Sequence, residues 1–164
     1  MTFSVILDTS FLIHLLSEND RLHKNALCYF KYFLENNIPM YISTVSIAEY
    51  CVDGEIVELP LRNLRVVPFN FQHAIIAGKF AKVLFEAKNT GELEIGQRKV
   101  IPNDVKIFAQ ADYTTDIKYF VTSDVKSAKM IKKLSDSQNI SFSHMDISIP
   151  YNEQFGVLDM SVRQ

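Results

Sequence analysis

The apolar and polar positions of the chain alternate between short runs typical of strands and longer stretches with helical spacing. The first apolar run covers residues 2–7 and ends abruptly at Asp8, Thr9 and Ser10. A near-continuous apolar run with β-branched residues is typical of a parallel strand that is covered on both faces. Helical spacing follows over residues 11–16, and Thr9 or Ser10 can cap that helix.

The same alternation continues along the chain. The further strands that the pattern predicts are residues 40–42, 64–69, 117–121 and 140–145. The helices that it predicts between them cover residues 21–36, a segment from 43 or 44 to about 52, residues 71–88, a segment from about 104 to 111, and a segment that includes 128–134. Strands that alternate with helices predict an α/β fold, in which a mostly parallel sheet of four or five strands lies between two helical layers.

The length of 164 residues corresponds to about one domain with a single substantial core. We expect residues 1–147 to form this domain and residues 148–164 to form a C-terminal tail, where Pro150 and Gly156 disfavour a regular helix. Residues 92–99 are polar and are expected to form a loop. No internal repeat or low-complexity segment interrupts the chain.

Composition places the protein among ordinary globular proteins, with 48% hydrophobic and 22% charged residues. No apolar run approaches the roughly 20 residues that span a bilayer, and no basic region leads into an apolar signal sequence. We therefore expect a cytoplasmic protein without a membrane partner. Cys28 and Cys51 make no metal-binding pair, and both are expected to be reduced thiols in the core.

Four acidic residues stand at positions suited to chemistry. Asp8 and Asp124 directly follow predicted strands, Asp104 opens an apolar helix, and Glu49 lies on a helix after a strand. The carboxyl ends of parallel strands form the crevice where open α/β sheets bind ligands, so these carboxylates can converge there. Carboxylates gathered in one cleft repel each other, and oxygen ligands without His or Cys select hard cations such as Mg²⁺ or Mn²⁺. Such a site suits the hydrolysis of phosphodiester bonds.

Each carboxylate also has a plain structural interpretation. Asp8 and Asp104 can stabilise helix N-termini, and Glu49 can be a solvated helical side chain. Asp112 lies eight residues beyond Asp104, or ~12 Å farther along a helix, and cannot share its ion. The net charge of −2 excludes no class of partner, because four acids gathered at one site would leave a small basic excess elsewhere.

Other polar residues give weaker signals. Lysines and arginines that could guide a nucleic acid are more often a solvated surface; they are Lys82, Lys88, Arg98, Lys99, Lys106, Lys126 and Lys129. The histidines are isolated in the sequence and lack metal-ligand spacing, so we expect no catalytic role for His14, His23, His73 and His144.

The sequence resembles the PIN-domain ribonucleases, the fold of the VapC-type toxins of bacterial and archaeal toxin–antitoxin pairs. The matching segments are residues 5–10, 46–50, 103–111 and 121–124. The resemblance implies Mg²⁺- or Mn²⁺-dependent cleavage of single-stranded or looped RNA. It implies a catalytic and metal-binding quartet of Asp8, Glu49, Asp104 and Asp124, with Ser10 and Thr122 in support. It also implies a homodimer and a partner antitoxin that fills the cleft.

Two other functions, a phosphatase and an inactive binding module, share part of this pattern. Haloacid-dehalogenase-like phosphatases also begin with a strand that ends in an aspartate. These enzymes share a second aspartate two residues later, however, and this chain has Ser10 at that position. A catalytically inactive PIN-like module that binds RNA or protein stays open as the alternative, although all four acids are present.

Overall fold

The computed structural model of the chain describes residues 3–94 and 101–156. Its sheet contains five parallel strands in the order β3-β2-β1-β4-β5, so that the first strand lies in the centre. The strands are β1 (Ser4–Leu7), β2 (Met40–Ser43), β3 (Leu64–Val67), β4 (Ile117–Thr122) and β5 (Ser143–Asp146). Because all five run the same way, their carboxyl ends meet at one edge of the sheet.

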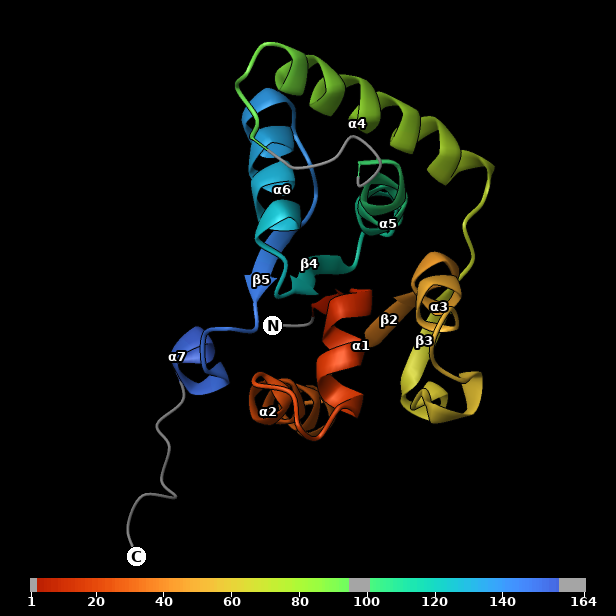
Figure 1. Cartoon of the computed structure of the whole chain (residues 1–164), viewed down its shortest axis with the longest axis vertical. Helices are drawn as coiled ribbons and strands as arrows, with labels where there is room; N and C mark the ends of the chain where they lie inside the picture. The colour runs from red at the N-terminus through yellow and green to blue at the C-terminus, as the bar shows by residue number, and fades with distance from the viewer. Residues whose placement is uncertain (1–2, 95–100, 157–164) are drawn as a thin grey trace, which may run out of the picture.

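Helices cover both faces of this sheet (Figure 1). They are α1 (Thr9–Leu16), α2 (His23–Glu35), α3 (Thr44–Tyr50), α4 (Phe71–Asn89), α5 (Ile101–Tyr113), α6 (Val125–Ser137) and α7 (Tyr151–Phe155), with short 3-10 turns at Ile56–Glu58 and Leu61–Asn63. Helices α4, α5 and α6 pack on one face, while α1 and α2 pack on the other. The predicted three-layer α/β/α fold is therefore confirmed.

The central strand shows why both faces are apolar. Successive side chains of a strand point to opposite faces. Ile6 accordingly belongs to the core beneath α4, α5 and α6, whereas Val5 and Leu7 belong to the core beneath α1 and α2. All three side chains are fully buried. The continuous apolar run read from the sequence thus reflects burial on both sides.

Element boundaries differ from the prediction at a few ends. The third strand ends at Val67, directly before Pro68, rather than at residue 69. The helix expected from residue 21 begins at His23, and α5 begins at Ile101, three residues before Asp104. Of the loop expected at 92–99, residues 95–99, which include Arg98 and Lys99, lie outside the described residues, and Leu93 is buried in the core.

The expectation of an irregular tail is wrong for Tyr151–Phe155, which forms the short helix α7. Pro150 precedes this helix, and Gly156 ends it in the left-handed conformation at φ 63°, which glycine adopts without strain. The ring of Phe155 stacks on that of Tyr32 in α2, with centroids 4.3 Å apart. Pro150 and Gly156 therefore mark the two ends of the helix rather than exclude it, and aromatic contacts pack it on α2. The proposed domain boundary after residue 147 remains a prediction.

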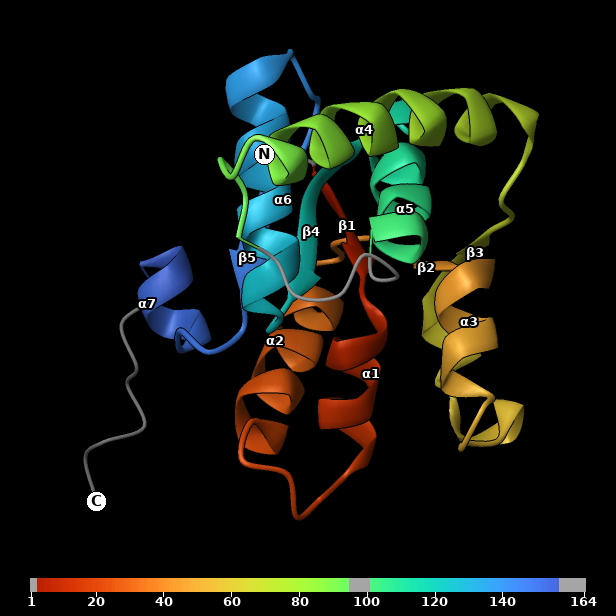
Figure 2. The ribbon, with the colours of Figure 1, turned by 45° about the horizontal axis from the view of Figure 1, so that its top comes forward.

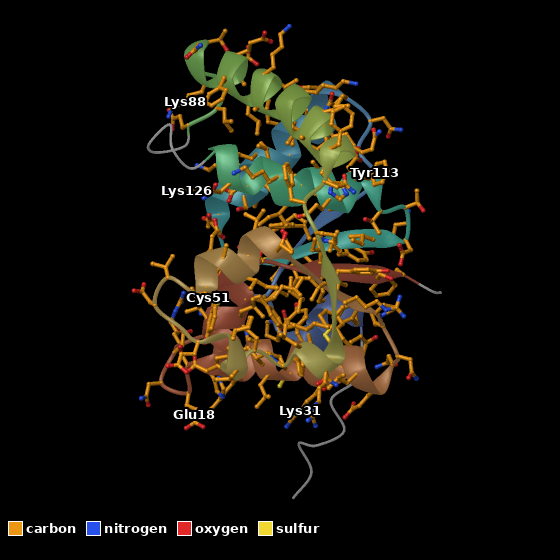
Figure 3. All side chains as sticks on the ribbon, turned by 90° about the vertical axis from the view of Figure 1, so that its right-hand side faces the viewer. Glu18, Lys31, Cys51, Lys88, Tyr113 and Lys126 are labelled. Carbon is orange, nitrogen blue, oxygen red and sulfur yellow. The ribbon has the colours of Figure 1, made fainter. Side chains whose placement is uncertain are left out.

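The expectation of buried cysteines is also wrong, since Cys28 and Cys51 are both exposed. Cys28 lies on the outer side of α2, whose buried residues include Ala26 and Tyr29. Cys51 directly follows the last residue of α3 and stands at the surface (Figure 3).

In the part of the chain that the structure describes, no helix is long and apolar enough to cross a bilayer.

Replacement of Phe155 by alanine tests the packing of α7. Since the substitution removes the ring stacked on Tyr32, we expect the free energy of unfolding in urea to fall by about 1–3 kcal/mol. Phe71→Ala is the matched control, because the Phe71 side chain is 75% exposed, and it is expected to change stability little. Equal stability of the two variants would contradict the docking of α7 on α2.

Candidate functional site

The four predicted acids lie around the carboxyl edge of the sheet. Asp8 follows β1, and its backbone N–H donates to Val121 O in β4 at 3.0 Å. Asp124 follows β4 as the N-cap residue of α6. Asp104 lies in the first turn of α5, and Glu49 lies in α3. Figure 2 shows that α1 and α6 begin where β1 and β4 end.

Asp8 is the most buried of the four, with an exposed fraction of 7%. Its Oδ2 accepts hydrogen bonds from Ser10 Oγ and from Thr122 Oγ1, each at 2.8 Å, and the two hydroxyl oxygens lie 3.0 Å apart. Asp8 occupies the N-cap position of α1, yet its side chain makes no capping hydrogen bond. The plain capping interpretation therefore does not explain this carboxylate.

Burial raises the pKa of Asp8 above its usual value. The hydrogen bonds from Thr122 and Ser10 oppose this change, and the negative charge of Glu49 adds to it. The two hydroxyls that the resemblance implies as support for the quartet thus contact the buried carboxylate directly.

Asp104 and Asp124 share one hydroxyl group. Ser127, which is 1% exposed, lies with its Oγ 3.4 Å from Asp104 Oδ2 and 3.4 Å from Asp124 Oδ2. Asp124 Oδ1 also accepts from the backbone N–H of Lys126 at 2.9 Å. A single serine proton can be donated to only one of the two carboxyl groups at a time.

The charges of all three other acids affect the pKa of Asp104. Burial raises its pKa to about 8, and the charges of Asp8, Asp124 and Glu49 contribute to the rise, in that order. Like charges at short range disfavour the ionised form. The charges of the other three acids therefore couple electrostatically to Asp104.

Glu49 is half-buried, and its Oε2 accepts a hydrogen bond of 2.6 Å from Thr9 Oγ1 at the start of α1. It lines a cavity of about 400 Å³ between α1 and α3. Glu49 is therefore partly withdrawn from water rather than a freely solvated helical side chain.

The donor set suits a hard divalent cation. All four side chains offer carboxylate oxygens. After burial, the charges of the other three acids contribute to the raised pKa of Asp104, and a cation would compensate that charge. Within residues 3–94 and 101–156, however, no three His, Cys, Asp or Glu side chains are arranged to hold a metal ion together. The oxygens of Asp8, Glu49 and Asp124 are instead directed toward hydroxyl or N–H donors. The roles of the quartet remain a prediction.

Two other aspartates, Asp112 and Asp116, lie away from this edge. Asp112 Oδ1 accepts from the backbone N–H of Ser141 at 2.7 Å. Asp116 Oδ2 accepts from Ser4 Oγ at 2.8 Å and from Tyr41 OH at 3.0 Å, at the amino end of the sheet. Both carboxylates therefore join secondary-structure elements.

Sequence reasoning missed part of the hydrogen-bond network. Ser127 and Thr9 were given no role at the site, although Ser127 lies one turn after Asp124 on the same helix. The absence of metal-ligand spacing also gives no sign of the contacts of His14, whose Nδ1 lies 2.7 Å from Asp20 Oδ1 and whose Nε2 lies 2.7 Å from Ser123 Oγ. The available signal was its spacing of four residues from Ser10, which places both side chains on one face of α1.

Comparison with known proteins supports the fold. No family model matches the sequence, and no curated protein matches it. The chain is similar to a chain in the crystal structure of DNA-bound VapBC from Salmonella typhimurium, with 19% identity and a TM-score of 0.53, over 89% of this chain and 99% of that one. It is also similar to a chain in the crystal structure of VapBC2 from Rickettsia felis bound to a DNA fragment from its promoter. The identity is 20% and the TM-score 0.55, over 89% of this chain and 100% of that one. These likenesses confirm the expected PIN-like fold.

The raised pKa of Asp104 gives a testable pH dependence. The folded protein binds a proton at Asp104 up to about pH 8, whereas the unfolded chain releases it near pH 3.8. The stabilising contribution is therefore complete below about pH 4 and is lost as the pH rises toward 8. In EDTA, we expect the free energy of unfolding to fall over this range, and Asp104→Asn to flatten the fall.

Asp136→Asn is the matched control for this measurement. Asp136 is an exposed carboxylate that pairs with Lys132 at 3.0 Å, on the later part of α6. Its removal is expected to leave the pH dependence of urea unfolding between pH 5 and 8 unchanged. Identical slopes for the wild type and Asp104→Asn would contradict the electrostatic coupling at Asp104.

Proposed function

We propose that the protein is a metal-dependent endoribonuclease that hydrolyses RNA phosphodiester bonds and serves as the toxin component of a toxin–antitoxin pair. The observation that carries the proposal is the electrostatic coupling of four acids around the carboxyl edge of a PIN-like sheet. The charges of Asp8, Asp124 and Glu49 act on Asp104 there, and the Ser127 hydroxyl contacts both Asp104 and Asp124. Their mutual repulsion is the electrostatic condition that a divalent cation relieves.

The residues that would hold Mg²⁺ or Mn²⁺ are Asp8, Asp104 and Asp124, together with Glu49. When bound, such an ion lowers the pKa of water and stabilises the attacking and leaving oxygens of a phosphodiester. The chain itself orients the carboxylates. Ser10 and Thr122 fix Asp8, and Thr9 fixes Glu49.

RNA as the substrate rests on the likeness to PIN-domain ribonucleases, and the antitoxin rests on the VapBC structures that share the fold. A partner that covers the carboxyl edge of the sheet would block access to all four acids at once. A homodimer and a cytoplasmic location belong to the same proposal.

The alternative function is an inactive PIN-like module that binds RNA or protein. The two functions differ in metal binding, because an inactive module has no need of a cation at the acidic edge. Titration of the protein with Mn²⁺ by calorimetry separates them: the nuclease takes up Mn²⁺ in a carboxylate-dependent way, and the module does not.

Cleavage of a mixed pool of structured RNAs tests the proposal directly. Wild-type protein is expected to cut in Mn²⁺ and not in EDTA. Asp8→Asn is expected to lower the cleavage rate by about a hundred-fold or more, corresponding to ~2.7 kcal/mol of transition-state stabilisation. The fold is expected to remain intact, because the substitution removes a buried acid from an anionic cleft.

The control variant is again Asp136→Asn, which removes an exposed carboxylate far from Asp8 in sequence and is expected to cut like the wild type. Thermal unfolding of each variant establishes that the protein is folded. The assignment fails if Asp8→Asn loses folded protein while the folded remainder keeps full specific activity.

A further inference from the structure

A second hydrogen-bonded chain of side chains reaches the site from the loop after α1. Asp20 Oδ1 lies 2.7 Å from His14 Nδ1, and His14 Nε2 lies 2.7 Å from Ser123 Oγ. Ser123 stands between Thr122, which bonds Asp8, and Asp124, which caps α6. This chain therefore ends in the turn that carries one acid of the quartet and one supporting hydroxyl.

Asp20 fixes the orientation of the imidazole. Its Oδ1 also accepts from the backbone N–H of Leu22 at 2.7 Å, and this bond, followed by the contact with His14, lowers the pKa of Asp20. An ionised carboxylate only accepts hydrogen bonds, so the proton of the shared bond belongs to His14 Nδ1. In the neutral imidazole, Nε2 is then an acceptor for the hydroxyl proton of Ser123.

The turn at the end of β4 is held from several sides. The backbone N–H of Asp124 donates to Thr122 Oγ1 at 3.0 Å, and that of Ser123 lies 3.4 Å from Ser10 Oγ. Among the described residues, His14 is the hydrogen-bonding partner of the Ser123 side chain. Loss of the imidazole would release that side chain and loosen the turn beside it.

We propose that His14, oriented by Asp20, is a positioning residue that acts through Ser123 to hold the Thr122–Asp124 turn and thereby to place Asp124 at the acidic edge. The effect on metal binding rests on the proposed function, whereas the effect on the turn does not. Positioning partners of metal ligands typically contribute 10–100-fold to metal affinity or activity.

The order Asp20–His14–Ser123 also matches that of a nucleophilic serine triad. The surrounding backbone does not support that chemistry. An oxyanion needs free N–H donors near the nucleophile, but the N–H groups of Ser123, Asp124 and Lys126 are all directed toward side-chain oxygens of the chain itself. These engaged donors favour a positioning role.

Amide hydrogen exchange tests the positioning without any metal. In His14→Ala we expect the amides of Ser123, Asp124 and Lys126 to exchange about ten-fold faster, as expected for the loss of one hydrogen bond. Amides of α4, on the far face of the sheet, are expected to be unchanged. His14→Gln, whose amide can still reach Ser123, is expected to restore part of the protection.

His23→Ala is the matched control. The His23 ring bonds the backbone carbonyl of His14 at 3.1 Å and so belongs to the same junction between α1 and α2, but this hydrogen bond does not involve Ser123. His23→Ala is expected to leave amide exchange at the Thr122–Asp124 turn unchanged. If it accelerates that exchange as much as His14→Ala does, the acceleration comes from disturbing the contact between α1 and α2, and the proposal is overturned.

Titration with Mn²⁺ alone measures the consequence for the site. His14→Ala and Ser123→Ala are each expected to weaken Mn²⁺ binding about ten-fold. The double variant is expected to be no weaker than either single variant, because His14 acts through Ser123. In cleavage assays the Mn²⁺ concentration for half-maximal activity should rise, while the KM for RNA stays constant.

The outcomes separate the inference from the proposed function. Unchanged exchange at the turn in His14→Ala, or additive losses in the double variant, would overturn the positioning role. No Mn²⁺ uptake by the wild type would contradict the proposed function and the metal-binding part of the inference. In that case the exchange experiment still decides whether His14 holds the turn.

Discussion

Repulsion between carboxylates that are partly withdrawn from water is the constraint on which the site depends. Asp8 is almost fully buried, and burial, together with the charges of the other three acids, raises the pKa of Asp104 to about 8. Such an arrangement costs stability in the absence of a cation, because each group disfavours ionisation of the others. Hydroxyls from Thr9, Ser10, Thr122 and Ser127 offset part of this cost by donating to the carboxylates.

The parallel sheet creates this constraint. With β1 in the centre, paired to β2 on one side and β4 on the other, the residues that follow β1 and β4 are necessarily neighbours. Apolar layers on both faces leave the carboxyl edge as the place where polar groups can gather. The helices that begin there bring Asp104 on α5 and Ser127 on α6 toward the same point.

The parts of the structure that were predicted correctly have local signals. A buried strand followed by a carboxylate is visible in the sequence at Asp8 and again at Asp124, and alternation of strands with helices suffices for the three-layer fold. The helix α7 was missed because Pro150 and Gly156 were taken as helix breakers, whereas they stand at its two ends, and because its packing against Tyr32 is a contact between distant segments. The link from Asp20 to Ser123 through His14 was missed for the same reason, since it joins residues more than a hundred positions apart.

The central claim is that the carboxyl edge of the sheet holds a divalent cation, and crystals grown with Mn²⁺ test it most directly through anomalous scattering. An anomalous peak within ligand distance of Asp8, Asp104 and Asp124 oxygens, about 2.0–2.3 Å, is the expected result. That peak should be lost in crystals of Asp8→Asn. Well-ordered wild-type crystals with no anomalous density at this edge, at millimolar Mn²⁺, would contradict the claim.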